Sequence, residues 1–231
     1  MTLCPCDILT HSFSVLLQEL SKQGHTPIFG NSVIHIGAHD GIEADIYDYF
    51  GAKNVVWFEC NPNVFPNLLK RINEKKRSAK HLAYQSALWS EAGKELEFNF
   101  YRDKCDGASG FFLPEKMFDY IKDCPLLEDK IKIKTNTLNN YINDGIIDIS
   151  NVSFLNIDVQ GAELEVFKGA TKLLDNPKLQ YIWCEVSWDN VYKNAPVMND
   201  ITEYLKQYGF GIVGLRKDWE IHGDALYMRV E

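Results

Sequence analysis

The chain reads Val33-Ile34-His35-Ile36-Gly37-Ala38-His39-Asp40-Gly41 where its first predicted strand passes into a helix. The apolar run ends at the first of two glycines, and helical spacing begins directly after the second. A helix that opens at such a turn leaves its first backbone N–H groups unpaired and directed at a ligand. The stretch therefore predicts a strand–turn–helix unit that binds a nucleotide. A tight connection without a ligand is the alternative, because short glycine motifs produce many false matches.

An acidic residue ends the next apolar run. Asn54–Glu59 is a second predicted strand, and Glu59 follows Gly41 by eighteen residues. A carboxylate at that position can accept both hydroxyls of a ribose, which predicts an adenosine-like cofactor with an unphosphorylated 2′-hydroxyl. Glu59 could instead be a surface carboxylate. Both features, however, fall at the carboxyl ends of neighbouring strands, where open α/β sheets bind ligands.

The composition indicates one acidic domain. The 231 residues are 45% apolar, and no linker divides them, so residues 1–231 can form a single domain around one core. We expect residues 1–30 to form an N-terminal helical segment and residues 102–145 to be an insertion that shapes the substrate site. The formal net charge of −8 argues against general nucleic-acid binding and against anionic membranes as partners.

Cysteine usage and apolar segments bear on the cellular compartment. The six cysteines show no zinc-like spacing, and a chain of this length does not depend on disulfides, so we expect reduced thiols in a cytoplasmic protein. Residues 1–17 do not resemble a cleavable signal, and nowhere do eighteen apolar residues follow one another, which predicts no membrane insertion. The cysteines are Cys4, Cys6, Cys60, Cys105, Cys124 and Cys184.

The hydrophobic periodicity predicts an α/β fold with helices on both faces of a mostly parallel sheet. The last two strands are joined by about nine residues, too few for a crossover helix, so they should form an antiparallel hairpin. An amphipathic helix over Leu9–Lys22 is expected to cover an edge or lid of the sheet. The expected strands are 33–36, 54–59, one ending near 87, 94–101, 131–135, 152–158, 179–185, 210–215 and 225–230, and the other expected helices are 42–50, 63–76, 114–122, 138–143, 162–174 and 197–208.

Acidic residues also end two strands of the second half. Asp158 ends the strand 152–158 at the predicted cleft, and Gly161 lets the backbone come close before the next helix. Glu185 ends the strand 179–185 in an apolar setting, where a desolvated carboxylate is suited to general-base work. Glu163 is expected to hydrogen-bond back to the turn. Asp158 could instead cap the helix, and Glu185 could form a structural salt bridge.

Three weaker signals follow the strand that ends at Glu185. His222, in the predicted hairpin loop, is a third candidate base, although most loop histidines are merely solvated. Asp158 and the pair Asp189-Asn190 offer oxygen ligands suited to Mg²⁺, but their spacing is loose and no metal ligand is predicted. Trp188 and Trp219, with Tyr192 nearby, could stack on a sugar ring or pack in the core.

Three segments resemble the FkbM family of S-adenosylmethionine-dependent methyltransferases. They are residues 33–41, Glu59-Cys60-Asn61-Pro62, and above all Phe154–Gly169 with its Asp158-x-x-Gly161-x-Glu163 block. The similarity keeps the same order over Val33–Arg229. It implies a seven-stranded Rossmann-like methyltransferase fold, S-adenosylmethionine as cofactor, and transfer of a methyl group to a hydroxyl of a sugar, a glycan or a related small molecule.

The resemblance also implies roles for individual residues, with two departures from the family's pattern. His35 stands where an acidic residue is common, and Ser86 stands where asparagine is common; we expect His35 to hydrogen-bond the methionine end of the cofactor and Ser86 to contact the adenine. The implied cofactor residues are His35, Gly37, Ala38, His39, Gly41, Glu59, Cys60, Asn61, Ser86, Ala87 and Asp158, and the implied catalytic residues are Asp158, Glu185 and His222.

Two other functions stay open. An NAD-dependent oxidoreductase would use the same turn, but residues 41–45 lack the third glycine of that motif, and such an enzyme gives no reason for the terminal hairpin. A noncatalytic domain could keep the fold and the cofactor while serving as a binding partner. Asp158 and Glu185 argue against that function, while His35 keeps it open.

Overall fold

A computed structural model describes residues 13–101, 107–116 and 126–230 of the chain. These residues form a seven-stranded sheet in the order β3-β2-β1-β7-β8-β10-β9 and a three-stranded sheet in the order β4-β6-β5. The strands are β1 (Ser32–Ile36), β2 (Asn54–Glu59), β3 (Lys80–Gln85), β4 (Ala87–Leu88), β5 (Glu95–Tyr101), β6 (Leu126–Asn136), β7 (Val152–Ile157), β8 (Tyr181–Ser187), β9 (Phe210–Trp219) and β10 (His222–Arg229). The helices are α1 (Phe13–Lys22), α2 (Ala44–Tyr49), α3 (Phe65–Asn73), α5 (Leu138–Asn143), α6 (Glu163–Lys168), α7 (Thr171–Leu174) and α8 (Met198–Lys206).

The large sheet is parallel except at one edge. β2 and β7 pair in parallel with β1, β3 pairs with β2, and β8 pairs with β7. β10 runs antiparallel to both β8 and β9. This arrangement confirms the predicted mostly parallel sheet with a C-terminal antiparallel hairpin. The strand order reverses direction between β1 and β7, and open α/β sheets bind ligands at the carboxyl ends of such a pair.

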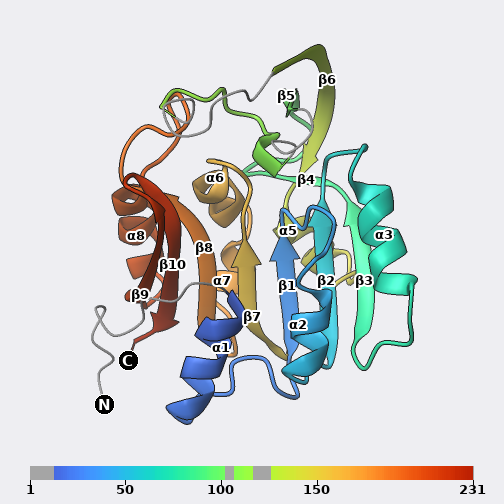
Figure 1. Cartoon of the computed structure of the whole chain (residues 1–231), viewed down its shortest axis with the longest axis vertical. Helices are drawn as coiled ribbons and strands as arrows, with labels where there is room; N and C mark the ends of the chain where they lie inside the picture. The colour runs from blue at the N-terminus through green and yellow to red at the C-terminus, as the bar shows by residue number, and fades with distance from the viewer. Residues whose placement is uncertain (1–12, 102–106, 117–125, 231) are drawn as a thin grey trace.

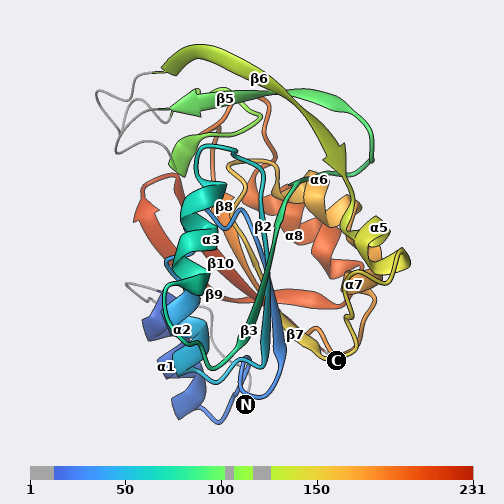
Figure 2. The same cartoon turned by 90° about the vertical axis from the view of Figure 1, so that its right-hand side faces the viewer.

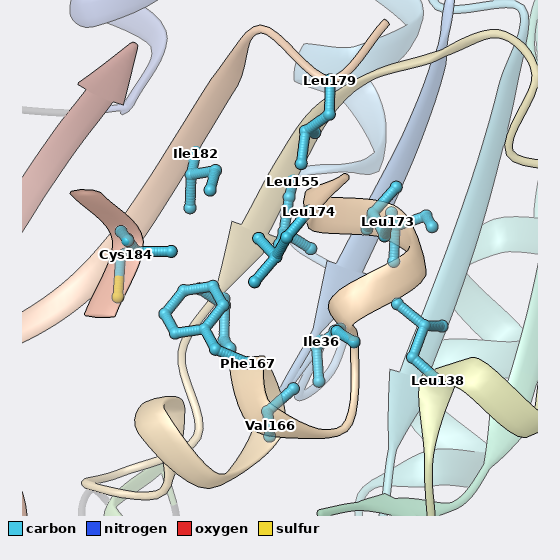
Figure 3. Packing of buried hydrophobic residues seen from close by; sticks show 14 of the residues in the cluster. Ile36, Leu138, Leu155, Val166, Phe167, Leu173, Leu174, Leu179, Ile182 and Cys184 are labelled. Atoms are coloured by element: carbon cyan, nitrogen blue, oxygen red, sulfur yellow. The ribbon is translucent and has the colours of Figure 1, made fainter. Parts of the chain in front are cut away.

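Helices cover both faces of the sheet: α1, α2 and α3 lie on one side and α5, α6, α7 and α8 on the other (Figures 1 and 2). Each face buries its own apolar cluster. Figure 3 shows one of them, in which Phe167 and Leu174 pack together with Leu155 and Ile182 of two neighbouring strands. None of the helices in the described ranges is long and apolar enough to cross a membrane.

Helix α1 lies against a face of the sheet, so the prediction that it covers an edge or lid is wrong. Its buried side chains are Phe13, Leu16, Leu17 and Leu20. The Phe13 ring centroid lies 5.7 Å from that of Phe154 in β7. An apolar stripe of this width needs an equally apolar partner, which the face of the central strands offers and a solvated edge does not. The predicted first turn, residues 9–12, lies outside the described residues.

The small sheet stands over the carboxyl ends of the central strands (Figures 1 and 2). β6 is longer than the predicted 131–135 because β5 pairs with it antiparallel over most of its length, with Phe98 opposite Ile131. β4 pairs with β6 in parallel. The predicted helix 114–122 does not begin at Pro114, which pairs with Tyr192 in an isolated bridge. Residues 117–122 of that helix lie outside the described residues.

Two boundary predictions in the second half are wrong. The predicted helix 162–174 is interrupted at Gly169, where a Cβ atom would lie 2.0 Å from the carbonyl oxygen of Trp89. The strands of the hairpin extend further than predicted, which places His222 in β10 rather than in a loop. The polar residues there resemble a loop in the sequence, but they pair across the hairpin: Arg216 Nε lies 2.7 Å from Asp224 Oδ2.

The described cysteines are thiols. Cys60 and Cys184 are unpaired, and burial raises the pKa of both. The other four cysteines lie outside the described residues.

Candidate functional site

A cavity of about 290 Å³ lies at the carboxyl ends of β1, β2 and β7, close to the lower end of the usual range for small-molecule sites. Phe98 of β5 and the segment 107–111 also line it, so the described part of the predicted insertion borders the cavity. The structure brings together every predicted cofactor residue except Gly41. The predicted residues that line the cavity are His35, Gly37, Ala38, His39, Glu59, Cys60, Asn61, Ser86, Ala87 and Asp158.

The backbone N–H groups of the turn after β1 are used within the protein. Gly37 and Ala38 donate to the carbonyl of Phe58 at 2.9 and 3.0 Å, and Gly41 donates to the carbonyl of Ala38 at 2.8 Å. These three N–H groups are therefore not available to a ligand, whereas the prediction of unpaired N–H groups concerns the first turn of the helix that follows Gly41. The acceptor comes from the neighbouring strand β2, which a local sequence pattern does not reveal.

The two glycines of the turn serve different purposes. Gly37 has a φ of 79°, and a Cβ atom there would lie 1.6 Å from the carbonyl oxygen of Asp158. The glycine thus lets the ends of β1 and β7 touch at the cavity floor. Gly41 has a φ of 71° and faces away from the cavity, where a Cβ atom would lie 2.5 Å from Leu68 of α3. Gly41 is required for packing against that helix.

Glu59 is a buried carboxylate whose orientation is fixed by backbone donors. Its Oε2 accepts the N–H of His39 at 2.8 Å, and its Oε1 accepts the N–H of Asn61 at 2.6 Å. Burial raises the pKa of Glu59, and these two bonds lower it in part. Each carboxylate oxygen can accept a further hydrogen bond, so the side chain can bind two hydroxyl groups at the cavity. Ser86 is held beside it, because the Ser86 N–H donates to the Glu59 carbonyl at 3.1 Å.

His35 lies in the floor of the cavity. Its Nδ1 is 3.1 Å from the hydroxyl of Tyr47, which accepts a hydrogen bond from Asn156 Nδ2 at 2.9 Å. Burial lowers the pKa of His35 to about 3, so the ring is neutral. His35 therefore ties β1 to α2 and brings no charge to the cavity.

Three acidic side chains meet where β7 and β8 end. Asp158, Glu163 and Glu185, hereafter the carboxylate cluster, each offer an oxygen within 4.8 Å of the others. Gln160 Nε2 donates to Asp158 Oδ1 at 2.5 Å and to Glu185 Oε1 at 3.0 Å, and the Tyr192 hydroxyl donates to Gln160 Oε1. Such a set could hold a cation, but the protein already supplies hydrogen-bond donors to it.

The remaining members of this region confirm one expectation and alter another. Glu163 accepts the N–H groups of Val159 and Gly161 at 3.0 and 3.2 Å, which is the predicted bond back to the turn. Asp189, considered with Asp158 for Mg²⁺, instead forms an ion pair with Lys116. It does not belong to the carboxylate cluster.

Close packing raises the pKa of several carboxyl groups. Desolvation raises the pKa of Asp158 well above its usual range, and the charges of Glu185, Asp224 and Glu163 raise it further. Desolvation, together with Glu185, raises the pKa of Glu163 to about 8. Desolvation also raises the pKa of Asp224 to about 7, although Arg216 opposes the shift. The region therefore keeps protons at neutral pH that separate carboxylates would lose.

Glu185 and His222 do not line the cavity. They border a separate small hollow with Gly161 and Tyr192, and His222 Nε2 is 2.8 Å from Glu185 Oε1. Burial alone would lower the pKa of His222, but the Glu185 carboxylate reverses the effect and the pKa is raised. Of the three predicted catalytic residues, Asp158 alone lines the cavity. Gln160 connects it to Glu185.

Among the residues of the cavity wall that sequence reasoning missed, two bear on the chemistry. Glu43 borders the cavity directly before α2, and nothing in the local pattern distinguishes it from a solvated residue of the first helical turn. Gln160 has a φ of 55°, which is costly for a residue with a side chain. Its position before Gly161 in the Asp158 block is the signal that could have identified it.

Comparison with known proteins agrees with this geometry. The family model described as the methyltransferase FkbM domain matches residues 35–212. No curated protein matches the chain. Among solved structures, magnesium protoporphyrin IX methyltransferase (ChlM) from Synechocystis PCC 6803 with bound SAH is 10% identical, with a TM-score of 0.52, and the match covers 94% of this chain and 80% of that one. The same enzyme with bound SAM is 11% identical, with a TM-score of 0.50 and coverage of 94% and 77%. At these identities the likeness shows a shared fold.

Proposed function

The chain belongs to the FkbM methyltransferase family, whose model covers residues 35–212, and from this premise we propose that it is an S-adenosylmethionine-dependent O-methyltransferase. The acceptor would be a hydroxyl of a sugar, a glycan or a related small molecule. The observation that supports the proposal most directly is that one cavity is lined by both Glu59 and Asp158, on opposite sides of the β1 turn. A carboxylate suited to a ribose thus shares a cavity with a carboxylate suited to an acceptor.

The lining of the cavity supports the following arrangement of the methyl donor. The ribose would lie at Glu59, whose two oxygens are fixed by backbone donors. The adenine would extend toward Ser86 and Ala87, beside Cys60 and Asn61. The methionine moiety would cross the backbone at 37–39 toward the end of β7. Gly37 has no side chain, so no side chain projects from it into the cavity where the ends of β1 and β7 touch, and this supports the proposed path.

Methyl transfer requires the protein to position the donor and the acceptor, to exclude water and to supply a base. The bound sulfonium supplies an activated methyl group, whose bond to sulfur breaks as its bond to the acceptor oxygen forms. Asp158 is placed to take the hydroxyl proton, because it lines the cavity. Its raised pKa means that it must first lose its own proton, and the ionised carboxylate is then a stronger base than an ordinary aspartate. Glu185 and His222 would act through Gln160, by keeping Asp158 in position.

Several features favour a small polar acceptor in a cytoplasmic setting. Phe98 and Phe111 give the cavity an aromatic wall, which suits the C–H faces of a sugar ring. The net charge of −8 disfavours acceptors rich in phosphate. The thiol state of Cys60 and Cys184 supports a reducing compartment.

Two measurements test the proposed function. Calorimetric titration of the chain should show binding of S-adenosylhomocysteine and no binding of NAD⁺. Binding of NAD⁺ without binding of S-adenosylhomocysteine would contradict the proposal and favour an oxidoreductase. Transfer of a labelled methyl group from S-adenosylmethionine to a panel of glycans and polyols should then give a product that resists mild alkali, as an ether does and an ester does not. Binding without transfer to any hydroxyl acceptor would favour a noncatalytic domain.

A further inference from the structure

Glu43 is a carboxylate of the cavity wall to which the proposed function gives no role. It directly precedes α2 and lines the cavity together with His35 and Gly37. Its side chain is 25% exposed, and within the described part of the chain the basic atom at ion-pair distance is His35 Nδ1, at 4.0 Å. Because His35 is neutral, this contact does not balance the charge of the carboxylate.

The groups around Glu43 do not balance its charge either. Arg71 is committed to Asp40 at 2.5 Å, and His39 lies 3.7 Å from the same aspartate. Burial raises the pKa of Glu43 to about 7, although a hydrogen bond to its own backbone lowers it; Asp40 raises it further, and His39 and Arg71 lower it. The titratable groups that face Glu43 are Asp40 and His39 of the turn, His35 of β1, Tyr47 of α2 and Arg71 of α3.

Glu43 and Glu59 reach the cavity from different elements: Glu43 directly precedes α2 and lies 4.0 Å from His35 Nδ1 of β1, whereas Glu59 ends β2. Tyr47, one helical turn further along α2, donates its N–H to the Glu43 carbonyl at 3.0 Å. The Tyr47 hydroxyl contacts both His35 of β1 and Asn156 of β7. The helix that begins after Glu43 is therefore anchored at the junction of β1 and β7, whereas Glu59 ends β2 on the other side of β1. A donor with its ribose at Glu59 would extend its methionine moiety toward that junction.

We propose that the Glu43 carboxylate binds the α-ammonium group of the donor's methionine moiety. This inference rests on the proposed function and adds to it a residue that orients the donor. Neither lysine nor arginine is among the described residues that line the cavity, so the bound ammonium supplies the cation that Glu43 lacks. A buried carboxylate bonded to a cation is held far more firmly than one left alone.

The experiment compares two ligands and two variants by calorimetry at pH 8, where Glu43 is ionised. The ligands are S-adenosylhomocysteine and its analogue with hydrogen in place of the α-amino group. Glu43→Gln keeps the shape of the side chain. The matched control is Asp45→Asn, at an exposed residue of α2 that pairs with Lys75 and Arg77. We expect Glu43→Gln to weaken S-adenosylhomocysteine about tenfold, the effect of one charge-assisted hydrogen bond, and to leave the analogue's affinity unchanged. Asp45→Asn should change neither.

The outcomes separate this inference from the function on which it rests. If the unaltered chain binds neither ligand, the proposed function fails. If it binds both and Glu43→Gln weakens them equally, or weakens neither, the assignment of Glu43 is overturned. A second readout distinguishes this role from an indirect effect of the substitution on folding. At pH 7, binding of S-adenosylhomocysteine should release protons from Glu43, and Glu43→Gln should reduce that release. Titrations in buffers of different ionisation enthalpy measure the number of protons released. Equal release by both proteins would contradict the inference.

Discussion

Replacing Glu59 by glutamine tests the ribose assignment with little change of shape. The carboxylate is 7% exposed and accepts N–H groups of His39 and Asn61 through its two different oxygens. In Glu59→Gln one oxygen becomes an amide nitrogen that faces a backbone donor instead of accepting from it. We therefore expect a loss of about 1–3 kcal/mol in the free energy of unfolding and a folded protein with a damaged ribose site.

The effect on binding follows from the same contacts. Two ribose hydroxyls bonded to one carboxylate contribute about 1.5–3 kcal/mol each, and the amide leaves one uncharged acceptor. The variant should lose about 3 kcal/mol of binding free energy, which is roughly a hundredfold increase in the Kd of S-adenosylhomocysteine. Glu59→Ala, which removes both acceptors, should abolish measurable binding.

Calorimetry with circular dichroism is the appropriate assay. Circular dichroism verifies that each variant is folded at the temperature of titration. Glu97→Gln, an exposed β5 residue that pairs with Lys130, is the control for a general effect of charge and should bind normally. A folded Glu59→Gln protein that binds S-adenosylhomocysteine within threefold of the unaltered chain would refute the ribose assignment.

Three further predictions concern the fold and the acidic groups. Gly37→Ala would place a Cβ atom 1.6 Å from a carbonyl oxygen of the next strand end, so urea denaturation should show a loss of more than about 3 kcal/mol; a loss below about 1 kcal/mol would contradict that contact. The folded chain keeps protons on Glu43, Glu163 and Asp224, whose pKa values are raised to about 7, 8 and 7, whereas the unfolded chain loses them near pH 4. The free energy of unfolding should therefore fall as pH rises from 6.5 to 8, a window above the range in which the lowered pKa of His35 acts. Glu163→Gln should flatten this slope, and a rise in stability over the window would contradict it. Finally, EDTA should leave the affinity for S-adenosylhomocysteine unchanged, because protein donors already satisfy the carboxylate cluster; a loss of affinity that Mg²⁺ restores would show a metal site.

Much of the architecture could be predicted from the sequence because the central strands are short, unbroken apolar runs. A strand shows such an unbroken apolar run only when both of its faces are covered. The glycines and acidic residues at the ends of these runs mark one edge of the sheet. For this reason Glu59 and Asp158 could be placed at one cavity before any coordinates were known. Their separation along the chain did not matter, since parallel strands bring their carboxyl ends together.

The errors concern features that depend on partners distant in sequence. The local sequence does not reveal that the N–H groups of Gly37 and Ala38 are used within the protein, because their acceptor, Phe58, belongs to the next strand. His222 was expected in a loop, because its polar neighbours pair only across the hairpin. The sequence does not single out Gln160, because two of its three contacts, those with Glu185 and Tyr192, are with residues distant in sequence. Such pairings depend on register and packing, which hydrophobic periodicity does not encode.

The length of β6 and the break at Gly169 show the same limit. β6 extends beyond its apolar core because β5 lies alongside it. Gly169 interrupts a helical pattern because the backbone of Trp89 passes close by. Neither neighbour is visible in a window of ten or fifteen residues.

The most direct test of the whole account is a crystal structure of the chain with S-adenosylhomocysteine. The account predicts both ribose hydroxyls within hydrogen-bond distance of the Glu59 carboxylate, with the sulfur on the Asp158 side of the β1 turn. Density for the ligand outside this cavity, or with its ribose at Asp158 and its methionine moiety at Glu59, would contradict it.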